Sequence, residues 1–330
     1  MALALVGLAG CDGSYSDVQG PPDRAPPDPL PPISSSDARP EPADADPPDA
    51  APDPAPWLRL DHLQMRGTHN SYHRAPAEPL LPEFAFDQPP LAVQLGPQGV
   101  RQIELDVHEA GGGVFAVYHV PGIDEESTCP TLRDCLAEVE GWSATHPSHH
   151  ALFVFIEPKT AFASQADALD RAILDVWPRE RIISPGDVRG AHPDLRTAIA
   201  VDGWPSVHAS RGKALFFLFD DGLPRDRYLA AQPDPLLFVR YPMSDAGAPE
   251  AVFFNHDVVD PERFAALAGE GAILRTRGDD AANRARALGS AAHIISLDDA
   301  DALELPDGTP SRCNPVTAPP ECTPALIEPR

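Results

Sequence analysis

The chain has 330 residues and a formal net charge of −25, with 50 acidic against 25 basic side chains. This charge argues against nucleic acid as a partner and against docking on anionic membranes through a basic patch, because both need a positive surface. An anionic substrate would need a local cation, such as a bound metal ion, to overcome the surrounding negative field.

The first eleven residues resemble a bacterial lipoprotein signal. They are apolar and end in the tetrapeptide LAGC, which closes at Cys11. Cys11 is therefore the predicted lipidation site of an exported, cell-envelope lipoprotein, anchored to the membrane through its N-terminus. A secreted protein, or an uncleaved and frayed N-terminus, is the alternative.

Residues 12–56 are rich in Pro, Asp and Ala and carry ten acidic and two basic side chains, which leaves −17 for the rest of the chain. Such a stretch cannot bury enough apolar surface to fold, so it is a predicted disordered, partly polyproline tether. The predicted folded domain covers 57–330, with an acidic tail from about 300. Its size is typical of one barrel of roughly 250 residues, expected to be a monomer.

Short β-like runs alternate with helical segments throughout the folded part. The predicted strands are Leu63–Thr68, Val100–Val107, Val114–Tyr118, Ala151–Ile156, Ala214–Phe219, Leu236–Arg240, Ala251–Phe254, Ala272–Arg275 and His293–Leu297. The predicted helices are Leu132–His146, Gln165–Trp177, Pro261–Ala268 and Asp280–Leu288. This alternation implies a parallel sheet, and about eight strands in one domain favour an α/β TIM (β/α)₈ barrel, regular or irregular. The alternative is an open doubly wound sheet, but no Gly-x-Gly-x-x-Gly follows the first strand.

Four cysteines remain besides Cys11. In an exported protein we expect the bonds Cys129–Cys135 and Cys313–Cys322, although four cysteines allow three connectivities. A zinc site is disfavoured because neither pair has the C-x₂₋₄-C spacing.

Carboxylates and an asparagine follow the ends of the first strands. Glu104 and Asp106 are two residues apart on one strand, so both point to the same face. Two such carboxylates inside a barrel are costly unless they are paired or metal-bound. The alternative is one exposed acidic face of an edge strand. With Asn70 and Glu157 they form an oxygen-rich set that suits Ca²⁺ or Mg²⁺.

Two histidines accompany this set. His69 ends the first strand and His119 follows the run that begins at Val114, so the two could serve as general base and acid near neutral pH. Lys159 lies two residues beyond Glu157 and is a candidate phosphate contact; the alternative is a surface Glu–Lys pair. The other histidines, His73 among them, are expected to be surface or packing residues.

Several blocks together resemble the bacterial Ca²⁺-dependent phosphoinositide-specific phospholipase C family, within the PI-PLC-like phosphodiesterase superfamily. They are GTHNSYH (67–73), ELDV (104–107), the segment 119–150, FIEPK (155–159), 204–220 and 273–299. The resemblance spans nearly all of residues 57–300 and implies a TIM barrel with Ca²⁺ as cofactor. It implies Asn70, Glu104, Asp106 and Glu157 as Ca²⁺ ligands and His69 and His119 as the catalytic pair. Lys159 and Arg275 are the predicted phosphate or head-group contacts.

The reaction implied by the resemblance is attack of the inositol 2-hydroxyl on the phosphate of a phosphatidylinositol-type lipid. The products would be a cyclic inositol phosphate and diacylglycerol. One alternative is a glycerophosphodiester phosphodiesterase acting on a soluble phosphodiester, but those enzymes typically carry His-Arg-Gly where this chain has His69-Asn70. Another is a non-catalytic surface lipoprotein that keeps the barrel as a binding module; it would be expected to lack some site residues, and none is missing.

Overall fold

The computed structural model describes residues 53–159, 166–305 and 309–328. The predicted signal with Cys11, and nearly all of the predicted tether, lie outside the described residues. The folded part begins slightly ahead of residue 57, because Ala55 is already buried in the core. Asp53 also accepts a hydrogen bond from the Ser206 hydroxyl.

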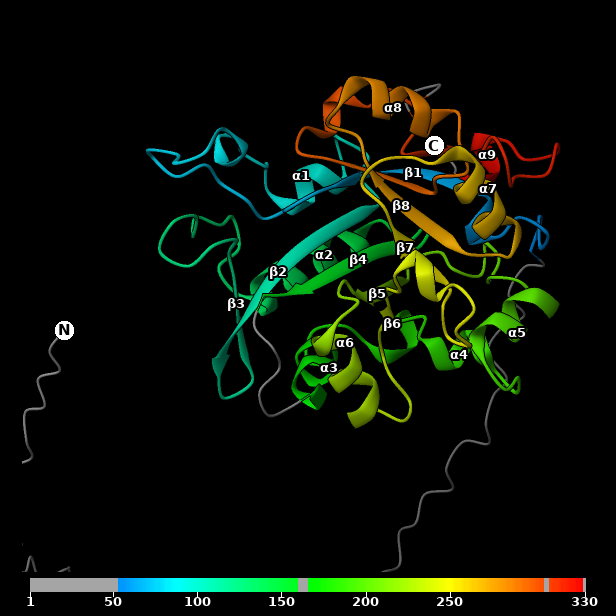
Figure 1. Cartoon of the computed structure of the whole chain (residues 1–330), viewed down its shortest axis with the longest axis horizontal. Helices are drawn as coiled ribbons and strands as arrows, with labels where there is room; N and C mark the ends of the chain where they lie inside the picture. Colours follow the sequence, from blue (N-terminus) through cyan, green and yellow to red (C-terminus); the bar gives the residue numbers. More distant parts are fainter. Residues whose placement is uncertain (1–52, 160–165, 306–308, 329–330) are drawn as a thin grey trace, which may run out of the picture. The chain divides into compact units, whose positions relative to one another are not determined.

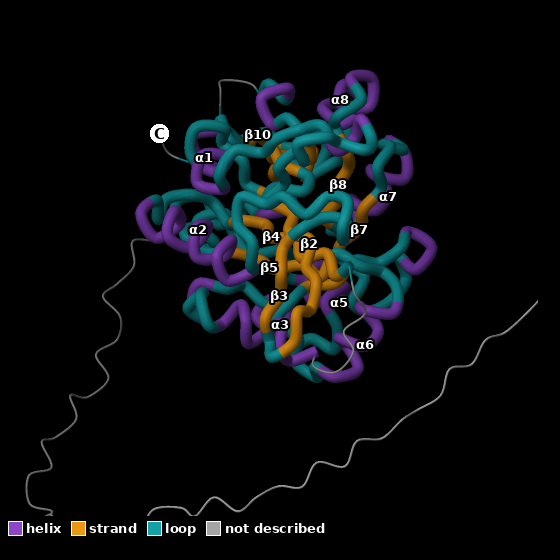
Figure 2. Tube along the Cα trace, turned by 90° about the vertical axis from the view of Figure 1, so that its left-hand side faces the viewer, coloured by secondary structure: helices purple, strands orange, loops and turns teal. Residues whose placement is uncertain are grey.

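Eight parallel strands form a nearly closed barrel in the order β6-β5-β4-β2-β1-β9-β8-β7. The two ends of this row meet at a parallel bridge between Tyr241, just after β6, and Phe254 in β7. The strands lie at the centre and the helices surround them (Figure 2). The predicted TIM-barrel fold is confirmed. The barrel strands are β1 (Leu63–Thr68), β2 (Gln102–Gly111), β4 (Leu152–Pro158), β5 (Ala214–Leu218), β6 (Phe238–Val239), β7 (Phe253–Asn255), β8 (Ile273–Arg277) and β9 (Ile294–Leu297).

The helices begin where polar side chains satisfy their first backbone N–H groups. Thr131, Asp194, Asp260 and Asp280 each accept a hydrogen bond from the N–H three residues further on. Four helices match the predicted ones, namely α2 (Leu132–Thr145), α3 (Ala166–Leu174), α7 (Pro261–Gly269) and α8 (Ala281–Leu288). The others are α1 (Leu91–Leu95), α4 (Pro185–Arg189), α5 (Leu195–Val201), α6 (Leu223–Ala231) and α9 (Pro324–Ile327).

Strand β4 shows how the core is divided. Leu152, Val154 and Ile156 pack in the cluster that contains α2 and α3. The alternate residues Phe153 and Phe155 instead join the phenylalanines that fill the barrel interior. Because the strand is buried on both faces, its sequence reads as a continuous apolar run.

Two shorter strands extend the sheet at opposite ends of the barrel. β3 (Val114–Val117) pairs with the end of β2 in an antiparallel hairpin that projects from the carboxyl-terminal edge (Figure 1). β10 (Ser311–Cys313) pairs antiparallel with the start of β1, so the C-terminal segment covers the amino-terminal edge.

The structure forms both predicted disulfides, Cys129–Cys135 and Cys313–Cys322. Disulfides of this kind are typical of oxidising compartments. Within the described ranges, no helix combines the length and apolar character needed to cross a bilayer.

Candidate active site

Three carboxylates converge where β2 and β4 end. Asp106 and Glu157 are register partners on these neighbouring parallel strands, and Glu104 lies two residues before Asp106 on the same face. One oxygen from each of the three lies within 4.8 Å of the others. The predicted acidic cluster is therefore assembled at the carboxyl-terminal edge of the barrel.

Burial makes this concentration of negative charge costly. The side chains of Glu104 and Asp106 are 1% and 0% exposed. Burial raises the pKa of Asp106 well above its ordinary value, and the Glu157 carboxylate raises it further. Each ionised carboxylate here therefore requires a nearby positive charge.

Two cationic side chains, Lys159 and Arg275, contact the carboxylates directly. Lys159 Nζ lies 3.0 Å from Asp106 Oδ2 and donates a hydrogen bond to Glu157 Oε1 at 2.9 Å. Arg275 Nη2 donates to Glu104 Oε2 at 2.9 Å. These contacts show where Lys159 and Arg275 lie, whereas their predicted role as substrate contacts stays a prediction. Arg277, which pairs with Asp279 and Asp298, places a third positive charge near Glu104.

The fourth predicted ligand, Asn70, has a left-handed backbone with φ of 43°, a conformation that Asn tolerates better than most residues. Its flanking residues both contact Glu104: the Ser71 N–H donates to the Glu104 carbonyl at 2.9 Å, and His69 Nε2 lies 3.5 Å from the Glu104 carboxylate. Asn70 is thus held beside the acidic cluster.

Some buried oxygens of the cluster have no hydrogen-bond partner. Among the residues that the structure describes, they include Asn70 Oδ1 and Asp106 Oδ1, whereas Asp106 Oδ2 is 3.0 Å from Lys159 Nζ. Buried polar atoms normally find a partner, and a set of carboxylate and amide oxygens suits a hard cation. Ca²⁺ therefore fits the residues present, with Asn70, Glu104, Asp106 and Glu157 as its proposed ligands.

His69 lies between the acidic cluster and a second aspartate. Its Nδ1 is 2.8 Å from Asp298 Oδ1, just after β9. Burial lowers the pKa of His69 to about 3, and the Glu104 carboxylate opposes this only in part. The imidazole is therefore neutral near neutral pH. Asp298 was not among the predicted site residues, although it directly follows a barrel strand, which is the signal that marked the other residues.

His119 follows β3 and reaches the same side of the barrel. Its Nδ1 lies 2.8 Å from Asp124 Oδ2, and its ring meets Phe84 edge-on at 5.3 Å between centroids. The His119 ring lies 6.4 Å from the His73 ring between centroids. Gln88 links His73 to His69: its N–H donates to the His73 carbonyl at 2.9 Å and its side-chain Nε2 to the His69 carbonyl at 3.1 Å. The structure therefore brings both predicted catalytic histidines to one mouth.

Asp124 and His73, which contacts Asp124 as well, were also not among the predicted site residues. His73 is fully buried, and its Nε2 lies 2.9 Å from both Asp124 oxygens. The expectation of a plain surface or packing residue does not account for these polar contacts. Asp124 lies in a loop, where hydrophobic periodicity gives no signal.

A family model described as Ca²⁺-dependent phosphoinositide phospholipase C matches residues 113–315. The chain belongs to this family. The matched region contains His119 and Glu157, whereas His69, Asn70, Glu104 and Asp106 precede it. The pairing of Asp106 with Glu157 on neighbouring strands joins the two groups.

Solved structures of two bacterial proteins share the fold. A calcium-dependent phosphoinositol-specific phospholipase C from Pseudomonas sp. has 19% identity and a TM-score of 0.66, covering 79% of this chain and 97% of that one. A Ca²⁺-dependent phosphatidylinositol-specific phospholipase C from Streptomyces antibioticus has 21% identity and a TM-score of 0.59, covering 74% and 96%. No curated protein matches the chain.

Proposed function

We propose that this protein is a Ca²⁺-dependent phosphodiesterase that cleaves phosphatidylinositol-type phospholipids to a cyclic inositol phosphate and diacylglycerol. The observation that carries the proposal is the buried cluster of Glu104, Asp106 and Glu157 beside His69. Membership in the phospholipase C family agrees with this chemistry. A bound Ca²⁺ would supply electrostatic stabilisation of the phosphate and lower the pKa of the attacking hydroxyl.

The two histidines divide the proton transfers. His69, neutral and held at Nδ1 by Asp298, has Nε2 available to accept the proton of the inositol 2-hydroxyl. The 2-oxygen then bonds to phosphorus as the bond to the glycerol oxygen breaks. His119, held at Nδ1 by Asp124, donates a proton from Nε2 to the departing diacylglycerol oxygen.

The surface around the mouth favours a lipid substrate. Four large apolar side chains are exposed in the loop after β1 and around the β2–β3 hairpin, with exposures of 70% for Leu80, 45% for Leu81, 51% for Val114 and 44% for Ile123. Ile123 is four residues beyond His119. Apolar side chains at the rim can contact acyl chains without the help of a basic patch.

The decisive experiment compares phosphatidylinositol, its 2-O-methyl derivative and glycerophosphocholine, with calcium and with excess chelator. We expect calcium-dependent cleavage of phosphatidylinositol alone, with the cyclic phosphate seen by ³¹P NMR. Cleavage of the 2-O-methyl lipid or of glycerophosphocholine would favour direct attack by water, as in a glycerophosphodiester phosphodiesterase. Full activity in chelator would exclude the metal role.

We also propose that the chain is an exported lipoprotein anchored through Cys11. Its support is the LAGC tetrapeptide followed by the Pro-rich segment, together with the two disulfides. Expression of the full chain in a bacterial host should place it in the membrane fraction, and Cys11→Ser should move it to the soluble fraction. A Cys11→Ser protein that stays in the membrane fraction would contradict the anchor.

A further inference from the structure

The orientation of His119 depends on one residue of its own loop, Asp124. The Asp124 carbonyl accepts hydrogen bonds from the N–H groups of His119 at 3.1 Å and of Val120 at 2.9 Å. Its carboxylate oxygen Oδ2 faces Nδ1 of His119 at 2.8 Å. Gly122, with φ of 70°, makes the turn that folds the loop back on itself. Asp124 thus fixes both the backbone and the ring of this histidine.

Asp124 is itself held from a distant part of the sequence. Its side chain is fully buried, and Nε2 of His73 lies 2.9 Å from each of its oxygens. The other ring nitrogen of His73 lies 2.9 Å from the Phe86 carbonyl, and the ring stacks on Phe86 at 4.2 Å. With both nitrogens and one face engaged, His73 has little freedom to move, and neither does the carboxylate it contacts.

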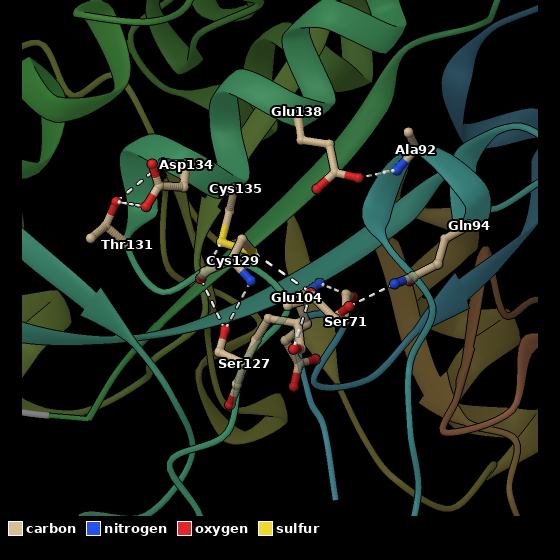
Figure 3. The surroundings of a disulfide bond; sticks show 12 residues. Ser71, Ala92, Gln94, Glu104, Ser127, Cys129, Thr131, Asp134, Cys135 and Glu138 are labelled. Atoms are coloured by element: carbon tan, nitrogen blue, oxygen red, sulfur yellow. Dashed lines mark hydrogen bonds between the residues drawn. A yellow bond between two sulfur atoms is a disulfide. The ribbon is translucent and has the colours of Figure 1, made fainter.

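The backbone around these two residues is joined as well. His73 pairs with Ser127 in an antiparallel bridge, and the Thr128 N–H donates to the Tyr72 carbonyl at 2.7 Å. The disulfide Cys129–Cys135 then attaches this segment to α2. Figure 3 shows the disulfide and the hydrogen bonds of Ser127 with the Cys129 backbone. The loop that carries Asp124 is thus a fixed part of the barrel mouth.

We propose that Asp124 is the positioning residue of His119 and that His73 holds Asp124 in place. The proposal rests on the proposed function, in which His119 protonates the leaving oxygen. Asp124 and His73 act through the direction of the His119 ring, since Nδ1 is committed to Asp124 and Nε2 is left for the substrate. A small misplacement of a reacting group can cost roughly 10²-fold in rate.

A double-mutant cycle tests the positioning role. Asp124→Asn, His119→Ala and the double variant are assayed on phosphatidylinositol and on a nitrophenyl inositol phosphodiester, whose leaving group needs no proton. We expect Asp124→Asn to lose roughly 10²-fold on the lipid, and to cause no further loss when His119 is already Ala. An undiminished loss in the His119→Ala background would overturn the proposal. Glu126→Gln, an exposed acidic neighbour in the same loop, is the matched control and should keep full activity.

Comparing the two substrates tests the positioning role of Asp124 separately from the proton-donor role of His119. If His119→Ala loses equally on both substrates, the proton-donor role fails, while non-additivity with Asp124→Asn still supports positioning. His73 gives an independent test, which also serves if Asp124→Asn does not fold. His73→Gln keeps an N–H donor for Asp124, and His73→Leu does not. With folding checked by thermal unfolding, the Gln variant should retain at least tenfold more activity; equal activities would overturn the role of His73.

Discussion

Two buried charged sites, Arg101 at the amino-terminal edge of the barrel and the acidic cluster at its carboxyl-terminal edge, differ in how their polar atoms are satisfied. At the amino-terminal edge, Arg101 donates hydrogen bonds to the carbonyls of Leu95 and Val100 at 2.7 and 2.8 Å and pairs with Glu328. At the carboxyl-terminal edge, Asn70 and Asp106 hold buried oxygens without hydrogen-bond partners among the described residues.

This difference distinguishes residues that stabilise the fold from residues that serve the reaction. A buried group whose bonds are all made within the protein holds the fold together, and a change there leaves unsatisfied partners behind. A buried group that lacks a partner costs stability unless a ligand completes it, so the carboxyl-terminal edge is arranged for something that binds. Substitutions in the acidic cluster should therefore lower activity but not stability, and substitution of Arg101 should lower stability but not activity.

The largest effect is expected from Asp106→Asn. Loss of one charged ligand should lower activity on the order of 10³-fold at fixed calcium, because a bound metal supplies several kcal/mol to the reaction. The metal-free variant should be at least as stable as the wild type, since a buried carboxylate is removed.

Calcium titrations of thermal unfolding check this without an assay. Calcium should raise the wild-type Tm by mass action but not that of Asp106→Asn. Asp234→Asn, at a carboxylate with 78% exposure, is the control and should respond like the wild type. A wild-type Tm that calcium leaves unchanged would contradict the metal site.

His119→Ala should come next, with turnover on phosphatidylinositol lowered roughly 10²- to 10⁴-fold, the usual contribution of one positioned proton donor. The loss should shrink on a nitrophenyl phosphodiester because that leaving group departs unprotonated. Steady-state kinetics on both substrates measure the difference, and an equal loss would mean that His119 binds phosphate or supports the structure.

At the other edge, Arg101→Met should lower the free energy of unfolding by about 3–5 kcal/mol, because it leaves Glu328 as a partly buried charge without its partner. Specific activity of the folded protein should stay unchanged. Arg133→Met provides the matched control: its ion pair with Asp175 is 64% exposed on both sides, so the expected change is below about 1 kcal/mol. Urea unfolding measures both.

A smaller effect should appear in the pH dependence of stability. Burial lowers the pKa of His150 to about 3, where its ring bonds Ser311 across the amino-terminal edge. The folded state then binds fewer protons than the unfolded state at any pH between about 3 and the ordinary histidine value of about 6.5. Stability is therefore complete above pH 6.5 and falls as the pH drops below it.

His150→Asn removes this titrating group. Between pH 6.5 and 5, the free energy of unfolding should fall less steeply in the variant, by up to about 1.4 kcal/mol per pH unit. This window excludes the Glu328 carboxyl, whose pKa is lowered by Arg101 against its burial and which acts at lower pH. If the free energy of unfolding changes equally steeply with pH in the two proteins, His150 takes up its proton in the folded state.

The metal cluster could be predicted from the sequence because its signals are local. Glu104, Asp106 and Glu157 follow the period-2 pattern of strands and lie near the ends of apolar runs, where parallel strands bring side chains together. The order of these strands along the chain was enough to predict that the three carboxylates lie together. Their ligand role remains a proposal.

The partners of the histidines could not be predicted in the same way. Asp298 is 229 residues from His69, and only barrel closure through β9 and β1 brings them together. Asp124 is close to His119 in sequence, but its contact depends on a turn that hydrophobic patterning does not describe. Helix α4 was missed although Ser184 and Asp187 form a capping box that marks its start.

Both ends of the described chain are attached to the amino-terminal edge. Asp53 and Ala55 lie against the turn that precedes β5, and Glu328 is tied to Arg101 just before β2. The catalytic mouth opens on the opposite face. A carrier protein, an affinity tag or a solid support joined directly to the domain at residue 53 or 328 would therefore sit behind the barrel and leave the entrance clear, which makes this domain suited to display on a surface.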